Sequence, residues 1–262
     1  MNRIDHKFAA LEQQHKKALI PFITAGDPDF ATTEQLVLSL EQNGADIIEL
    51  GVPFSDPIAE GPVIQQASLR SLQGGTTLTG IFELVKKLRT KTQIPLILMM
   101  YVNTIYRFGI ERFFTLCKQT GIDAVIVPDL PFEEHEEIDD CALTNGVYPI
   151  NLVAPTSQNR IAEIAQNSNG FLYCVSSTGV TGMRNSFQTD FDRFFGMVEQ
   201  YATIPYCVGF GISSPEQVKT MKNYCNGVIV GSAIVKIVGE YGKNCTEPIG
   251  QFVKNLRNAL DD

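Results

Sequence analysis

Residues 46–62, DIIELGVPFSDPIAEGP, join a short apolar run to a loop rich in proline and glycine. The run at 46–50 predicts a buried strand, which places Glu49 near the end of that strand. The loop brings a second carboxylate, Glu60, back toward the same place. It also contains apolar residues that an ordinary solvated loop does not need, which favours a lid or a docking surface.

Seven further runs are mostly apolar without polar alternation, a pattern typical of parallel strands buried on both faces. Helical patterns separate them, at spacings that fit βα units. An amphipathic helix at 4–17 precedes the series, and an extra helix at 63–72 is inserted after the second strand. The eight predicted strands cover residues 18–24, 46–50, 95–101, 124–127, 148–153, 170–175, 205–208 and 227–230.

The chain has 262 residues and no linker or low-complexity tract divides it, so its length suits one α/β barrel of about 250 residues. The predicted fold class is therefore α/β, with residues 1–262 as a single (β/α)8 TIM barrel domain. This barrel would carry an extra N-terminal helix and an insertion after the second strand.

The net charge and the composition of the chain argue against some classes of binding partner. The net charge is −8 and there is no long basic run, which argues against nucleic acid and anionic membranes. The N-terminal segment is polar and no apolar stretch reaches about 18 residues, so neither a signal peptide nor a membrane span is predicted. We expect a cytoplasmic protein. Its six cysteines are scattered without zinc spacing, and we expect reduced thiols.

Barrel enzymes carry their chemistry at the C-terminal ends of the strands. No lysine falls there, which argues against imine chemistry. His6, His15 and His135 lie in polar helical segments, where we expect solvated surface side chains, so no metal site is predicted. Acid–base work is left to carboxylates. Glu49 leads because burial would raise its pKa, the alternative being a structural carboxylate that binds loop amides.

Glycines follow the sixth, seventh and eighth predicted strands, where many barrels bind phosphate through loop amides and a helix N-terminus. Each glycine alone could be a simple turn, but Gly182, Gly211, Gly231 and Ser232 together predict a phosphate site. Dinucleotide and P-loop motifs are missing. Aromatic residues that could wall a flat organic group, or could equally be core, are Phe22, Tyr101, Tyr173 and Phe210, of which Tyr173 and Phe210 lie beside the glycine loops.

Over its whole length the chain resembles the alpha subunit of tryptophan synthase. The motifs that carry the resemblance lie at residues 49–65, 21–28, 101–103, 128–131, 179–182, 209–213 and 231–235. The resemblance implies a retro-aldol lyase that cleaves the small phosphate substrate indole-3-glycerol phosphate to indole and glyceraldehyde 3-phosphate. It implies no cofactor in this chain. The pyridoxal phosphate would belong to a beta subunit, which takes the indole within an expected α2β2 tetramer.

By the same resemblance Glu49 is the general acid and base, and Glu60 stands where the family has an aspartate that stabilises the indole N–H. Tyr173 and Phe210 match the indole pocket, and Thr181 matches a loop threonine that closes over the site. The phosphate cradle would comprise Gly182, Gly211, Gly231 and Ser232. Loop 53–62, with Pro53 and Asp56, would meet the beta subunit.

Two other hypotheses stay open. One is a different phosphosugar barrel enzyme, such as an isomerase that uses a single glutamate. The other is a non-catalytic or weakly catalytic subunit that activates the beta chain, because residue 60 departs from the family pattern.

Overall fold

The computed structural model describes residues 2–175, 186–209 and 211–262. Its strands form one sheet in which every pairing is parallel. The order along the sheet is β5-β4-β3-β2-β1-β9-β8-β7-β6. The strands are β1 (Ala18–Thr24), β2 (Ile48–Gly51), β3 (Leu96–Met99), β4 (Ala124–Ile126), β5 (Tyr148–Pro149), β6 (Leu152–Val153), β7 (Leu172–Val175), β8 (Tyr206–Gly209) and β9 (Gly227–Val230).

The two ends of this sheet meet. β5 and β6 stand at opposite ends of the order, yet only Ile150 and Asn151 separate them in the chain. The Ile150 N–H donates to the Val125 carbonyl at 2.9 Å, and the Tyr173 N–H donates to the Asn151 carbonyl at 2.9 Å. The fifth predicted strand is therefore one interrupted strand that closes a (β/α)8 barrel. The predicted fold class is confirmed.

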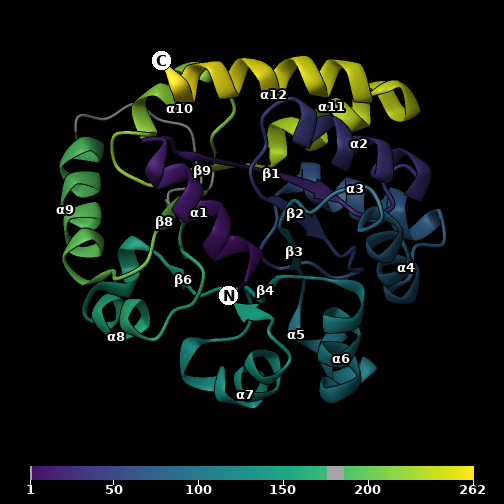
Figure 1. Ribbon diagram of the computed structural model, residues 1–262, viewed down its shortest axis with the longest axis horizontal. Helices are drawn as coiled ribbons and strands as arrows, with labels where there is room; N and C mark the ends of the chain where they lie inside the picture. Colours follow the sequence, from purple (N-terminus) through teal and green to yellow (C-terminus); the bar gives the residue numbers. More distant parts are fainter. Residues whose placement is uncertain (1, 176–185, 210) are drawn as a thin grey trace.

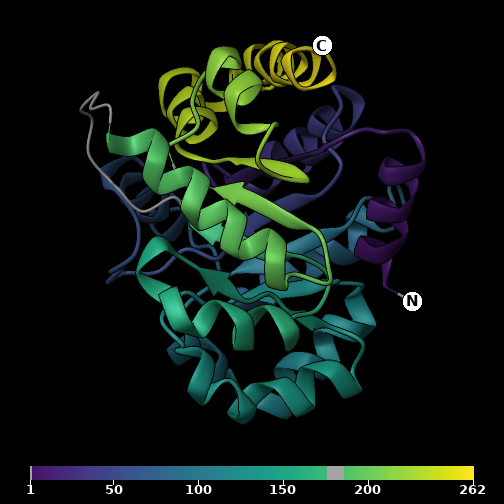
Figure 2. The same ribbon diagram turned by 90° about the vertical axis from the view of Figure 1, so that its left-hand side faces the viewer.

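Helices surround the barrel (Figures 1 and 2). The inserted helix and the helices after the strands occur as the sequence predicts, the N-terminal helix ends at Gln13 and not at residue 17, and α5 was not predicted. The α-helices are α1 (Arg3–Gln13), α2 (Phe30–Gln42), α3 (Pro62–Gln73), α4 (Leu78–Leu88), α5 (Val102–Phe108), α6 (Ile110–Thr120), α7 (Glu136–Thr144), α8 (Ile161–Gln166), α9 (Ser186–Tyr201), α10 (Pro215–Met221), α11 (Ser232–Tyr241) and α12 (Thr246–Asp261).

Side chains in and just before β2 point alternately to two buried apolar clusters, one outside the barrel and one inside it. Ile48 and Leu50 belong to the large apolar cluster between the strands and the helices, whereas Ile47 belongs to the cluster inside the barrel. Side chains on a strand alternate between its faces, so Glu49 points inward with Ile47. The sequence of β2 thus aims one carboxyl into an apolar interior.

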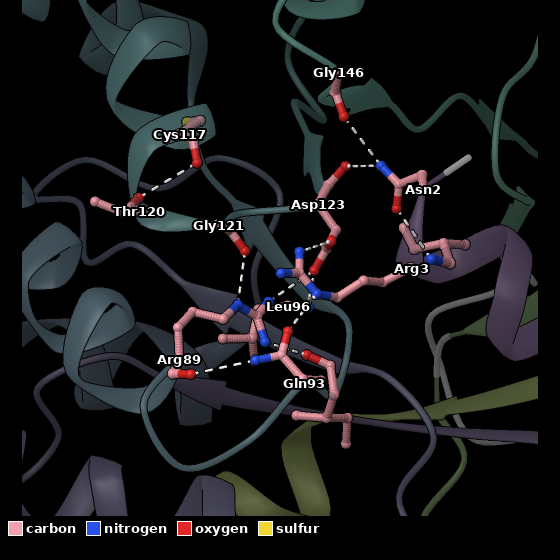
Figure 3. A network of polar contacts seen from close by, with 12 residues as sticks. Asn2, Arg3, Arg89, Gln93, Leu96, Cys117, Thr120, Gly121, Asp123 and Gly146 are labelled. Carbon is pink, nitrogen blue, oxygen red and sulfur yellow. Dashed lines mark hydrogen bonds and ion pairs between the residues drawn. The ribbon is translucent and has the colours of Figure 1, made fainter.

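Helix α1 closes the N-terminal end of the barrel. Its buried residues Ile4, Phe8 and Leu11 join the inner cluster. Asn2, the N-cap of α1, donates through its side-chain amide to the carbonyl of Asp123, which directly precedes β4, at 2.8 Å (Figure 3). The other end of the barrel is left for the site. No helix in the described ranges is long and apolar enough to cross a membrane.

Candidate active site

Glu49 is fully buried, with 0% of its surface exposed. Neither carboxyl oxygen has a hydrogen-bond partner in the described part of the chain. Burial raises the pKa of this carboxyl to about 8, because the apolar interior disfavours the charged form. No amide among the described residues donates to this carboxyl, so the described part of the chain does not use Glu49 as a structural carboxylate that binds loop amides. Glu49 is a buried acid that can hold and release a proton near neutral pH.

Aromatic rings line the same end of the barrel, and two glycines make room for them. Phe22 on β1 is paired in register with Glu49, and a Cβ on Gly51 would lie 2.4 Å from its Cζ. Tyr173 on β7 is 7% exposed, and a Cβ on Gly209 would lie 2.2 Å from its hydroxyl. Gly51 and Gly209 are thus required by the close approach of an aromatic ring.

The second carboxylate is held by a tyrosine. Tyr101 follows β3, and its hydroxyl donates to Oε2 of the half-buried Glu60. The same hydroxyl oxygen accepts the N–H groups of Ile58 at 2.9 Å and Ala59 at 2.8 Å. The tyrosine ring stacks on Phe54, with centroids 4.8 Å apart and planes at 27°. Burial and the bond to Glu60 raise the pKa of Tyr101 to about 12, so it remains a donor at neutral pH.

The predicted phosphate cradle is described in part. Gly211 has φ +77°, and no described residue beyond its chain neighbours lies within 4 Å of the place where a Cβ would stand. Gly231 is the N-cap of α11 and provides no capping side chain, and the exposed Ser232 begins the helix. Such a helix start favours anions. Thr181, Gly182 and Phe210 lie outside the described residues.

Other polar residues near the strand ends are occupied structurally. Asp27 accepts two hydrogen bonds from the Arg70 guanidinium, at 2.9 and 2.7 Å. Asp129 accepts the Val102 N–H at 3.0 Å and so caps α5. Sequence reasoning missed the bond between Tyr101 and Glu60. The sequence predicts Tyr101 and Glu60 as two separate site residues. Only their side-chain types, a hydroxyl donor and a carboxylate acceptor, indicate that they could be bonded to each other.

His135 corrects a sequence expectation. It was expected on the surface, but it is 4% exposed, and its Nε2 lies 3.1 Å from the Leu130 carbonyl. The polar helical segment around His135 is not one continuous helix: a 3-10 turn, Phe132–Glu134, precedes α7, and His135 stands between the two. The described residues contain no group of three His, Cys, Asp or Glu side chains that could hold a metal ion.

A separate cavity of about 370 Å³ lies at the opposite end of the strands. Its lining includes Lys17, Tyr206 and Asn226, which stand before or at the starts of β1, β8 and β9. None of the predicted site residues takes part in it. Because barrel enzymes carry their chemistry at the other end, this cavity is not the candidate site.

Comparison with known proteins gives one consistent result. The family described as "Tryptophan synthase alpha chain" matches residues 8–261. The tryptophan synthase alpha chain of Thermoanaerobacter sp. (strain X514) is 48% identical over 262 residues, which cover 99% of this chain and 100% of the relative. That of Clostridium kluyveri (strain ATCC 8527 / DSM 555 / NBRC 12016 / NCIMB 10680 / K1) is 46% identical over 265 residues, with both chains fully covered.

Solved structures agree. The crystal structure of tryptophan synthase subunit alpha from Legionella pneumophila str. Paris superposes with a TM-score of 0.91 at 35% identity, covering 100% of this chain and 99% of that one. A structure of the tryptophan synthase α2β2 complex from the hyperthermophile Pyrococcus furiosus gives a TM-score of 0.86 at 39% identity, with 93% and 99% covered. The likeness spans the whole barrel and is not confined to the site.

Proposed function

The chain belongs to the tryptophan synthase alpha chain family, which cleaves indole-3-glycerol phosphate to indole and glyceraldehyde 3-phosphate, and we propose that Glu49 and Glu60 carry this reaction. The observation that supports the assignment most is the state of Glu49. It is a fully buried carboxyl with a pKa of about 8, and no described residue occupies either of its oxygens. Its proton is available to a substrate.

The reaction begins with proton transfer. The protonated Glu49 gives its proton to C3 of the indole, and the ring nitrogen supplies the electron pair. The bond between C3 and the glycerol carbon then breaks, and its electrons return to the ring. The carboxylate left on Glu49 takes the proton of the glycerol hydroxyl as that carbon becomes an aldehyde. One proton enters and one leaves, so a single group with a pKa near the working pH can perform both transfers.

Glu60 acts at the other side of the ring. Positive charge develops on the indole N–H as C3 is protonated, and a fixed carboxylate stabilises that charge in the transition state. Phe22 and Tyr173, with Phe210 by the resemblance, would provide the apolar slot. The phosphate would be held by Gly211, Gly231 and Ser232, together with Gly182, and Thr181 would close over it. No step requires a metal or an imine.

We also propose a partner. Loop 53–62 carries Ile58, whose surface is 81% exposed, and such an apolar side chain suits contact with another protein. One solved relative is an α2β2 complex. We therefore propose that this loop meets a beta subunit in an α2β2 tetramer and that this subunit holds pyridoxal phosphate. A single domain over residues 1–262 and a cytoplasmic location are further proposals.

One assay tests the assignment. Cleavage of indole-3-glycerol phosphate is measured for the wild type and Glu49→Gln, each with and without the cognate beta subunit. We expect cleavage by the wild type and its loss in the variant. Wild-type cleavage that survives the substitution would refute the role of Glu49. A wild type that activates the beta chain without cleaving would support the non-catalytic hypothesis, which the comparisons do not favour.

A further inference from the structure

Three consecutive residues of loop 53–62 meet at one oxygen atom. The Tyr101 hydroxyl oxygen accepts the N–H groups of Ile58 and Ala59, at 2.9 and 2.8 Å, and donates its proton to Oε2 of Glu60. A hydroxyl has one proton to donate and two lone pairs to accept with, so these three bonds use its full capacity. The hydroxyl of Tyr101 therefore has no capacity left for a substrate.

The ring of Tyr101 is engaged as well. One of its faces stacks on Phe54 at the start of the same loop, with a centroid distance of 4.8 Å. Tyr101 itself is 3% exposed and stands between β3 and α5, as the N-cap of α5. One rigid barrel residue thus contacts both the beginning and the end of the loop. The loop is attached to the barrel through this side chain.

The attachment extends to the glutamate's backbone. The side-chain amide of Gln65, on α3, donates to the Glu60 carbonyl at 2.9 Å. Glu60 is therefore held at its carbonyl by α3 and at Oε2 by Tyr101. Its other carboxyl oxygen, Oε1, has no hydrogen-bond partner among the described residues and stays available. The arrangement fixes one oxygen of the carboxylate and leaves the second for a ligand.

We propose that Tyr101 is a positioning residue, which orients Glu60 toward the indole N–H by fixing its carboxylate and the preceding loop. This inference rests on the proposed function of Glu60. It differs from the sequence expectation for Tyr101, which placed the side chain against the substrate. A glutamate has one more rotatable bond than the family's aspartate, so it depends more on such a contact to keep a single orientation.

The proposal predicts which kinetic constant changes. The charge on the indole nitrogen develops only during the reaction, so a misplaced Glu60 weakens the transition state more than the bound substrate. Tyr101→Phe keeps the ring and its stacking on Phe54 but removes the hydroxyl. We expect kcat to fall by about 10- to 100-fold and KM to change by less than about threefold.

A matched control is present in the chain. Tyr106 also donates its hydroxyl to a glutamate, Glu137, but this pair is exposed and lies on α5 and α7. Tyr106→Phe removes the same kind of bond and should leave kcat within about twofold of the wild type. A comparable fall of kcat in both variants would mean that any lost tyrosine bond on this side disturbs the enzyme, and the proposal would be wrong.

A double-mutant cycle tests whether Tyr101 acts through Glu60. In a Glu60→Ala background the carboxylate is gone, so adding Tyr101→Phe should change kcat by less than about twofold. An undiminished effect would show that the tyrosine acts on the substrate or on the fold instead. Amide hydrogen exchange gives a second readout, because the Ile58 and Ala59 N–H groups lose their acceptor and should exchange at least about tenfold faster in Tyr101→Phe.

The outcomes separate this inference from the proposed function. If the wild type cleaves the substrate and Glu49→Gln does not, while Tyr101→Phe keeps the wild-type kcat, only the role of Tyr101 is refuted. If the wild type does not cleave at all, the proposed function fails and the inference fails with it. Normal thermal unfolding of Tyr101→Phe, together with its retained KM, shows that the variant is folded.

Discussion

Phe22 and Glu49 occupy paired positions on the neighbouring parallel strands β1 and β2. Both are buried, and the cluster below them inside the barrel is apolar. The low polarity of this interior keeps the Glu49 carboxyl protonated to unusually high pH. The same pairing sets the acid beside an aromatic surface on which a flat ring could lie. The pairing of Phe22 with Glu49 therefore supports both the raised pKa of Glu49 and a substrate that contains a flat ring.

The first prediction concerns turnover. Glu49→Gln keeps the size of the side chain but cannot transfer a proton, so turnover should fall by about 10²- to 10⁴-fold while phosphate ligands bind nearly normally. Steady-state kinetics measure the loss of turnover, and a thermal shift with glycerol phosphate measures the retained ligand binding. Glu34→Gln is the control, because Glu34 is buried but paired with Lys87 and Lys91 on α4 and the loop after it. More than a tenth of wild-type activity in Glu49→Gln would contradict the assignment.

The second prediction concerns stability against pH. The pKa of Glu49 rises from an ordinary 4.5 to about 8 on folding, so the folded chain binds this proton more tightly than the unfolded chain. The stabilising contribution is complete below pH 4.5 and is lost as pH rises through about 8. The full difference is on the order of 5 kcal/mol.

Glu49→Gln removes this dependence, since glutamine does not titrate. Urea unfolding of both proteins from pH 5 to pH 9 should show a steeper fall of the unfolding free energy in the wild type. Above pH 8 the variant should be the more stable of the two. Parallel curves over this range would mean that Glu49 is not desolvated in the folded protein.

The sequence predicted the barrel because each buried strand is an almost continuous apolar run, and it predicted Glu49 because one carboxylate interrupts such a run. Features that depend on contacts between distant segments were not predicted. Helix α5 lacks a capping side chain of its own and is capped by Asp129 from the loop after β4. The bond from Tyr101 to Glu60 joins residues 41 positions apart and depends on the path of loop 53–62. Neither contact leaves a local pattern.

The third prediction concerns the phosphate site. Gly211 and Gly146 have nearly the same φ, +77° and +74°, and a Cβ on either would meet no described residue beyond its chain neighbours within 4 Å. Valine at either position should cost similar stability, because β-branched residues disfavour positive φ. Only Gly211→Val, however, places a side chain where the phosphate is expected. We expect it to raise KM sharply and to abolish stabilisation by glycerol phosphate in a thermal shift.

Gly146→Val is the matched control, because Gly146 follows α7 at the N-terminal end of the barrel. It should lose stability but keep both KM and the ligand-induced shift. If Gly211→Val still gains stability from glycerol phosphate, the phosphate binds elsewhere.

The fourth prediction concerns the N-terminal end of the barrel. Asp123 is 3% exposed and joins Arg3 at 2.9 Å and Arg89 at 2.8 Å (Figure 3). It also accepts the Leu96 N–H at 2.9 Å. Burial lowers the pKa of Arg89 to about 10, so the guanidinium is still charged at neutral pH. Removing the carboxylate leaves that buried charge without its partner.

Asp123→Ala should therefore lower the unfolding free energy by about 3–5 kcal/mol. Asp123→Asn keeps a hydrogen-bond acceptor, so it should lower the unfolding free energy by less than Asp123→Ala. Urea unfolding measures both, and KM for indole-3-glycerol phosphate should stay unchanged because the network lies at the end of the barrel opposite the site. A loss below about 1 kcal/mol for Asp123→Ala would place this pair among ordinary surface ion pairs.

The last prediction concerns Glu60, where the chain departs from the family's aspartate. The longer side chain still offers a carboxylate to the indole N–H, and Tyr101 holds one of its oxygens. Glu60→Asp keeps the charge and restores the family residue, so activity should change by less than about tenfold. Glu60→Ala removes the partner of the developing positive charge, and activity should fall by at least about a hundredfold.

Both variants are assayed with the beta subunit present, so that a defect in activation is not mistaken for a defect in chemistry. Glu137→Ala is the control, because Glu137 also accepts a tyrosine hydroxyl, that of Tyr106, but lies on α7 outside loop 53–62. If Glu60→Ala cleaves as well as the wild type, Glu60 is only a loop residue and the mechanism with two carboxylates is wrong here. If Glu60→Asp loses as much activity as Glu60→Ala, the charge alone is insufficient, and the reach of the side chain to Tyr101 decides catalysis.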